Sequence, residues 1–173
     1  MYNAVDIAKW FLENNLDNPR NNLNGNIKLQ KLMFFSQLIY IALYDKYLIN
    51  DNFNAYEHGM VMESIRIKYK DNMNSILEEG NTNILSEEAL NALNLTKELY
   101  GDADAEELSS MSHEFNYWKT YYKKSDNGIY KSKKKSLVPN EELKKDIENI
   151  RNVLKANEII KKNKNKPLIE LDY

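Results

Sequence analysis

Residues 27–47 read IKLQKLMFFSQLIYIALYDKY, and this stretch decides the fold. Its apolar residues recur at helical spacing on one stripe, and further apolar residues fill much of the remaining surface. A helix that is apolar nearly all round belongs at the centre of a domain. Ser36 and Gln37 interrupt its most apolar part, which is shorter than the ~20 apolar residues that a membrane span needs. The stretch therefore predicts a buried core helix.

The composition around this helix predicts a mainly α, compact, single-domain fold. The chain has 173 residues, 42% hydrophobic and 29% charged, with only five glycines and three prolines. A small β-hairpin or short strand fits between Leu48 and Tyr56, or at the Asn127-Gly128 turn. We expect the domain to cover residues 1–154 and a lysine-rich C-terminal tail to cover residues 155–173.

Capping signals place the other helices. Asn3 is placed to begin the first helix, and residues 14–26 are rich in turn-forming asparagine, which predicts a loop. Gly59 is expected to open a helix that carries Val61, Ile65, Tyr69 and Met73. Ser86 begins the next helix, and Asp104 with Glu107 has the spacing of a capping box. Asn140 is expected to cap one last helix, with an apolar face formed by Leu143, Ile147, Ile150 and Leu154.

The overall charge and the missing cysteines limit the partners. The formal net charge is −2, so the chain has no strong general attraction to nucleic acid or to acidic membranes. No cysteine is present, which fits a reducing compartment. The N-terminus has no basic region before an apolar run, so it does not resemble a signal peptide. These features predict a cytoplasmic protein without a membrane partner.

Catalysis and metal binding have little support. His58 and His113 are the only histidines, and together with Glu57 and Glu114 they lack the spacing of a metal site. The serines near His113 are not flanked by glycines as a nucleophile elbow would require, and we expect His113 to bond carbonyls at a helix C-terminus. The glycines are scattered singly, so no phosphate loop is present. We predict no enzyme activity, no metal and no cofactor.

Two surfaces remain for a macromolecular partner. Lys131, Lys133, Lys134 and Lys135 lie near tyrosines, a pattern that can track nucleic acid, but a solvated lysine loop fits an acidic chain better. The segment from Tyr117 to Tyr122 holds four aromatic residues, too dense a group to face inward together. Tyrosine and tryptophan are enriched at protein interfaces. Protein binding is therefore the function class that the residues favour.

Three motifs add a family resemblance. They are KLQKL at residues 28–32, AYEHGMV at residues 55–61, and LSSMSHE at residues 108–114 followed by Trp118. As a set they resemble the Panacea domain of SocA-like antitoxins. The chain departs from this pattern at Met60, where the family usually has proline. Since proline pre-sets a first helical turn, we expect methionine there to give the same helical entry with less rigidity.

The resemblance implies a function without chemistry. Such proteins are antitoxins of type II toxin–antitoxin systems, often in phages or mobile elements, that bind and neutralise a protein toxin encoded beside them. Some act as adaptors that deliver the toxin to a AAA+ protease. The alternative is an interaction module that serves as a proteolytic adaptor or regulator for a non-toxin partner, and a homo-oligomer is compatible with either. The partner-binding residues that we predict are Lys28, Gln30, Lys31, Tyr56, His58, Gly59, Val61, His113, Glu114, Tyr117, Trp118 and Tyr121.

Overall fold

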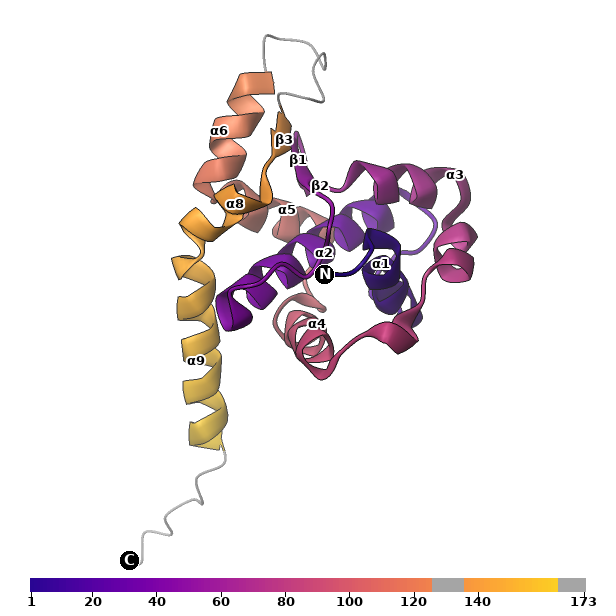
Figure 1. Ribbon diagram of the computed structural model, residues 1–173. Helices are drawn as coiled ribbons and strands as arrows, with labels where there is room; N and C mark the ends of the chain where they lie inside the picture. The colour runs from indigo at the N-terminus through magenta and orange to yellow at the C-terminus, as the bar shows by residue number, and fades with distance from the viewer. Residues whose placement is uncertain (126–135, 165–173) are drawn as a thin grey trace, which may run out of the picture.

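The computed structural model describes residues 1–125 and 136–164 (Figure 1). It is mainly helical, as the sequence predicts. The longer helices are α1 (Ala4–Glu13), α2 (Leu23–Tyr44), α3 (Glu63–Glu79), α4 (Glu87–Tyr100), α5 (Ala105–His113), α6 (Asn116–Ser125) and α9 (Glu148–Lys164). Shorter elements are η1 (Thr82–Ile84), α8 (Asn140–Leu143) and η2 (Lys144–Asp146). No described helix is long and apolar enough to cross a membrane.

Helix α2 runs through the centre of the molecule, which confirms the predicted core helix (Figure 1). Every residue from Lys28 to Ile41 along it is buried. Helices α1, α3, α4, α5 and α9 all pack against it. It begins at Leu23 rather than within the motif, because the Asn22 side chain accepts a hydrogen bond from the Gly25 N–H at 2.9 Å. The predicted loop at residues 14–26 therefore ends earlier than expected.

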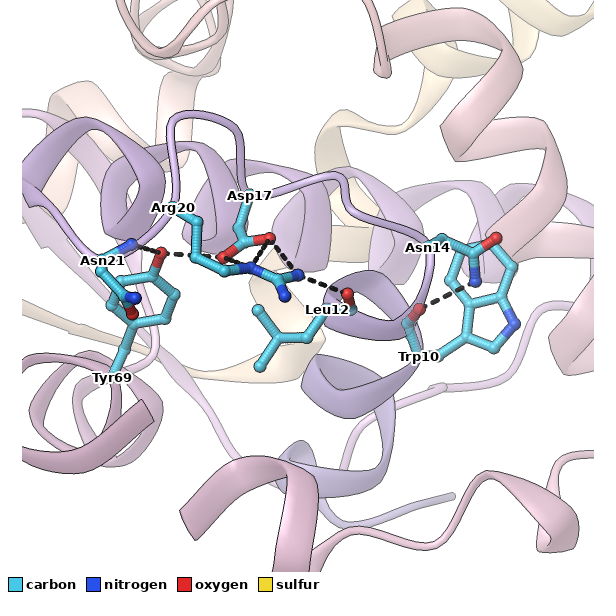
Figure 2. A network of polar contacts seen from close by, with 7 residues as sticks. All are labelled: Trp10, Leu12, Asn14, Asp17, Arg20, Asn21 and Tyr69. Carbon is cyan, nitrogen blue, oxygen red and sulfur yellow. Dashed lines mark hydrogen bonds and ion pairs between the residues drawn. The ribbon is translucent and has the colours of Figure 1, made fainter. Parts of the chain in front are cut away.

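That loop is fixed by a polar network (Figure 2). The Asp17 carboxylate is buried, and it accepts hydrogen bonds from the Arg20 guanidinium at 2.8 Å and from the Tyr69 hydroxyl at 2.9 Å. The Tyr69 hydroxyl in turn accepts from the Asn21 N–H. Because buried polar groups need partners, this set ties the loop to α3. Tyr69 is one of the core residues that its helical spacing predicts.

A three-stranded antiparallel sheet lies beside α2, in the order β2-β1-β3. Strand β1 (Phe53–Tyr56) confirms the strand expected between Leu48 and Tyr56. It pairs with β2 (Gly59–Val61) through Ala55 opposite Met60, and with β3 (Leu137–Val138) through Phe53 opposite Val138.

Two helix predictions are wrong. Gly59 to Val61 form β2 instead of opening a helix, and α3 begins only at Glu63, so Met60 lies in a strand. The predicted last helix from Asn140 is two helices, because α8 ends at Leu143 and η2 separates it from α9. Asn140 does not cap this segment, since Pro139 holds the cap position. The Asn140 side chain instead accepts a hydrogen bond from Gln37 of α2.

Other predicted boundaries are confirmed. The Ser86 hydroxyl caps α4 by accepting from the Ala89 N–H, and Asp104 and Glu107 form a complete capping box on α5. Asn3 holds the cap position of α1, but its side chain makes no capping hydrogen bond. The Asn127-Gly128 turn and the lysines at 131–135 lie outside the described residues.

Candidate partner-binding site

The three motif segments meet in one place. The first motif lies in the N-terminal half of α2. The second covers the end of β1, the turn and β2, and the third covers the C-terminal part of α5 and the residue after it. The Lys31 ammonium donates to the Met60 carbonyl at 2.8 Å, and the Gln30 side-chain carbonyl accepts from the Met62 N–H at 2.8 Å. These two side chains therefore hold the backbone at β2 and just after it against α2.

Gly59 is the closest crossing point of the three segments. Its φ of +93° lies where side chains are rarely tolerated. A Cβ atom there would lie 1.9 Å from the Ser112 hydroxyl oxygen and 2.8 Å from the Lys31 Cε. Glycine is thus required twice at this position, for its backbone conformation and for space.

An aromatic stack covers the outer side of this crossing. The rings of His113 and Trp118 stack with centroids 3.9 Å apart, and Tyr122 stacks on Trp118 at 4.9 Å. The Trp118 indole N–H donates to the Tyr56 carbonyl at 2.9 Å, which joins α6 to the β1–β2 turn. Since indole nitrogen is only a donor, this bond fixes the orientation of the ring.

His113 ends α5 as predicted, but its side chain bonds to a different carbonyl from the one expected. It makes a hydrogen bond with the backbone of Glu57 in the β1–β2 turn, instead of with carbonyls at the end of its own helix. Burial lowers the pKa of His113, and the positive charge of Lys31 lowers it further. Its Nε2 atom is buried without a hydrogen-bond partner. Neutral imidazole is therefore the favoured form at this position.

Lys31 is the most unusual charged group of the site. Its side chain is fully buried, and burial lowers its pKa from 10.5 to about 7. No carboxylate contributes to this shift, so the cause is the loss of hydration alone. The Met60 carbonyl satisfies one donor of the amine, and the neutral form is easier to accommodate in such a site than the charged one.

The predicted partner-binding residues divide by exposure. Lys28, Gln30, Lys31, Gly59, Val61 and Tyr117 are buried, and the Lys28 ammonium donates to the Gly101 carbonyl at 2.7 Å. Tyr56, His113, Trp118 and Tyr121 are half-buried, and His58 and Glu114 are exposed. The buried group holds segments together, while the second group can reach another molecule. We call His58, Glu114, Trp118 and Tyr122 the motif surface.

Sequence reasoning did not find an apolar groove next to the motif surface. The groove has a volume of about 290 Å³ and is lined by Phe35, Leu99, Tyr100, Met111, Glu114, Phe115, Asn149, Ile150 and Val153. Its walls come from α2, α4, α5 and α9, so no single helical pattern could have predicted it. The sequence feature that could have indicated the groove is an apolar residue on the outward face of a helix, as at Met111 on α5 and Val153 on α9.

Within residues 1–125 and 136–164, no three or more His, Asp and Glu side chains are grouped as metal ligands. The arrangement has what contact with a protein requires, namely exposed aromatic area on a rigid base. The buried Lys31 and the half-buried His113 each bond to the segment of the second motif and so hold the three segments against one another.

Comparison with known proteins agrees with the three motifs. The family model for the antitoxin SocA-like Panacea domain matches residues 29–119, more than half of the 173 residues. No curated protein and no solved structure matches the chain. The matched range runs from within α2 to the start of α6 and includes the residues that build the crossing at Gly59. The chain therefore belongs to the SocA-like antitoxin family, and residues 29–119 are its Panacea domain.

Proposed function

We propose that this protein is the antitoxin of a type II toxin–antitoxin system and neutralises a partner protein toxin by binding it directly. The family match over residues 29–119 carries this proposal. Antitoxin domains of this family are generally not enzymes, and the buried Lys28, Gln30 and Lys31 side chains of the site bond to backbone groups of the same chain.

The motif surface supports direct contact as the mechanism. Trp118 and Tyr122 present stacked rings that are half-buried, and His58 and Glu114 of the same motif surface are exposed. Large aromatic residues surrounded by polar ones are typical of the residues that dominate binding energy at interfaces. The indole hydrogen bond to Tyr56 holds the ring in place before a partner arrives, which lowers the entropy cost of binding.

Co-expression with the protein encoded by the adjacent gene tests the proposal. We expect the neighbour alone to stop growth, and this chain to restore growth while co-purifying with it. Restored growth with a falling level of the neighbour and no stable complex would indicate delivery to a protease. A harmless neighbour that does not co-purify would contradict the antitoxin function.

Two charge reversals test the motif surface. Glu114→Arg changes an exposed side chain of the motif surface, and Glu78→Arg makes the same change on α3 at an exposed residue outside the matched motifs. We expect Glu114→Arg to weaken toxin binding by at least about tenfold and Glu78→Arg to leave it unchanged. Equal affinities for the two variants, both folded by circular dichroism, would exclude this surface from the interface.

A further inference from the structure

Helix α9 carries an apolar stripe that no described part of the chain covers. Val153 is 38% exposed and Ile160 is 51% exposed, and Ala156 between them is exposed as well. At about 100° per residue, these three side chains lie within about 60° of one another around the helix. Ile150 and Leu154, about 60° and 100° from Val153 around the helix, pack toward the core. The stripe thus adjoins the face that holds α9 on the domain at Val153 and turns away from it at Ala156 and Ile160.

The stripe is continuous with the apolar groove. Val153 lines the groove, and on the opposite wall Met111 is 43% exposed. Helix α9 runs along one edge of the molecule (Figure 1), and the three side chains of its stripe are exposed. A partner helix laid along α9 would cover the stripe and close the groove together.

The spacing of the stripe indicates that the partner helix is α9 of a second copy of the chain. Asn149, Val153, Ala156 and Ile160 follow each other at intervals of four, three and four residues, which is the spacing of a coiled-coil seam. The pattern is nearly symmetric about Ala156, since large apolar residues stand three positions before it and four after it. A two-fold interface requires a surface that is complementary to itself. With Ala156 near the axis, Val153 would meet Ile160 of the partner subunit.

The charge distribution also indicates that the partner helix is a second copy of α9. Between Glu98 and Glu114 the chain has six acidic residues and no lysine or arginine. Within one molecule, Lys161 of α9 forms an ion pair with Glu98 of this segment at 2.7 Å. Residues 148–164 contain five basic and two acidic residues. Glu114 of this acidic segment lines the groove, so a second α9 beside the first would bring basic charge toward an acidic side chain of the groove wall.

We propose that the protein forms a symmetric dimer in which two α9 helices pack antiparallel, cross near Ala156 and close the apolar groove. The small side chain at the crossing lets the helices approach closely. The seam spans only about 17 Å of helix, so the interface is at the small end of specific contacts and its dissociation constant is expected in the micromolar range. This dimer forms through α9 whether or not the partner of the motif surface is a toxin.

Sedimentation velocity over a range of concentrations tests the dimer. We expect the wild-type chain to shift from monomer to dimer with rising concentration, and Ile160→Glu to raise the dissociation constant by at least about 100-fold, because it buries two charges. Ile84→Glu is the matched control, since Ile84 is also 51% exposed and lies on η1. A wild-type chain that stays monomeric, or a dimer that survives Ile160→Glu, would overturn the proposal.

Cysteine cross-linking tests the geometry. The chain has no cysteine, so a single introduced thiol has one possible partner, the same residue in a second copy. Ala156→Cys is expected to form a disulfide-linked dimer under mild oxidation, because the crossing brings the two Cα atoms within bonding range. Lys155→Cys, turned about 100° away on the same helix, is expected to stay reduced. Equal cross-linking of the two variants would rule out this crossing.

The alternative is that a toxin binds the stripe, and the same variants distinguish toxin binding there from dimerisation. If the wild-type chain alone is monomeric, and Ile160→Glu abolishes co-purification with the toxin while Ile84→Glu does not, the stripe belongs to the toxin interface and the dimer is excluded. Retention of toxin binding by an Ile160→Glu monomer supports two separate surfaces.

Discussion

At the scale of the residue, Gly59, Lys31 and Ser112 depend on one another. The positive φ of Gly59 turns the chain into β2, and the missing side chain leaves room for the Ser112 hydroxyl and the Lys31 stem. The Lys31 amine then reaches the Met60 carbonyl. Each of the three motifs contributes one of these three residues. Motifs that are individually weak indicators of a family therefore describe a single contact point in the structure.

Gly59→Ala is therefore expected to lower the free energy of unfolding by about 3 kcal/mol or more, from the strained backbone and the overlap with Ser112. Urea denaturation measures this loss. The double variant Gly59→Ala, Ser112→Ala removes the overlapping oxygen and should regain part of the stability, although the backbone strain remains. A Gly59→Ala protein as stable as wild type would contradict the crossing.

Lys31 gives stability a pH dependence. Its pKa is about 7 in the folded chain and 10.5 in the unfolded one, so between these values the unfolded state binds more protons. The free energy of unfolding then rises with pH, with a slope of up to about 1.4 kcal/mol per pH unit. Urea denaturation from pH 7 to about pH 9 should show this rise.

Lys31→Met is the control for that slope. It removes the titrating group, so it should flatten the rise with pH. The lost hydrogen bond to the Met60 carbonyl adds a loss of stability that does not itself depend on pH. The chosen window avoids other groups. Burial lowers the pKa of His113 below 6.5, and burial raises the pKa of Tyr69 and Tyr100 to about 12, so their effects fall outside it. An unchanged slope in Lys31→Met would assign the pH dependence to another residue.

At the scale of the element, long patterns could be predicted and short ones could not. Helix α2 is evident because its apolar residues continue for many turns, and the caps of α4 and α5 are local chemistry. Strand β2 has three residues, too few to show an alternating pattern, and it exists because β1 pairs with it. The break between α8 and α9 was missed because Leu143, Ile147 and Ile150 keep helical spacing across it.

The candidate site shows the same limit. The motifs selected residues that do meet in space, but the pattern could not show that Lys28 and Lys31 are buried. Charged residues are rarely buried, and only the carbonyls that accept their hydrogen bonds explain the exceptions. The groove was missed because residues from four helices line it.

Trp118 decides how firmly α6 is attached. Trp118→Ala removes the hydrogen bond to Tyr56 and two ring stacks, and we expect it to lower the free energy of unfolding by about 2–3 kcal/mol. Trp118→Phe keeps an aromatic ring and should cost roughly half as much. Hydrogen exchange should show faster exchange in α6 for Trp118→Ala. Unchanged exchange with lost toxin binding would instead make Trp118 a direct contact only.

At the scale of the whole molecule, one core connects nearly all elements, and the end of α9 stands apart from it. The buried apolar cluster extends from Ala4 to Ile150, with Leu154 packed against its edge. Beyond Leu154, α9 is joined to the body by the hydrogen bonds of Asn157 and Lys161 with Glu98 at the surface. Exposed pairs of this kind contribute little to stability. The domain boundary predicted at residue 154 can therefore be tested separately from the fold.

A chain that ends at Leu154 should keep the fold and lose the dimer. Its core residues are all present, so we expect its melting temperature to fall by no more than about 5 °C. It lacks Ala156 and Ile160, so it should sediment as a monomer at every concentration. A chain that ends at Lys164 is the control, because it keeps all of α9 and should dimerise. If the shorter chain does not fold, the domain extends past residue 154. If it folds and still rescues growth from the toxin, the motif surface acts without α9 pairing, and dimerisation serves another purpose than neutralisation.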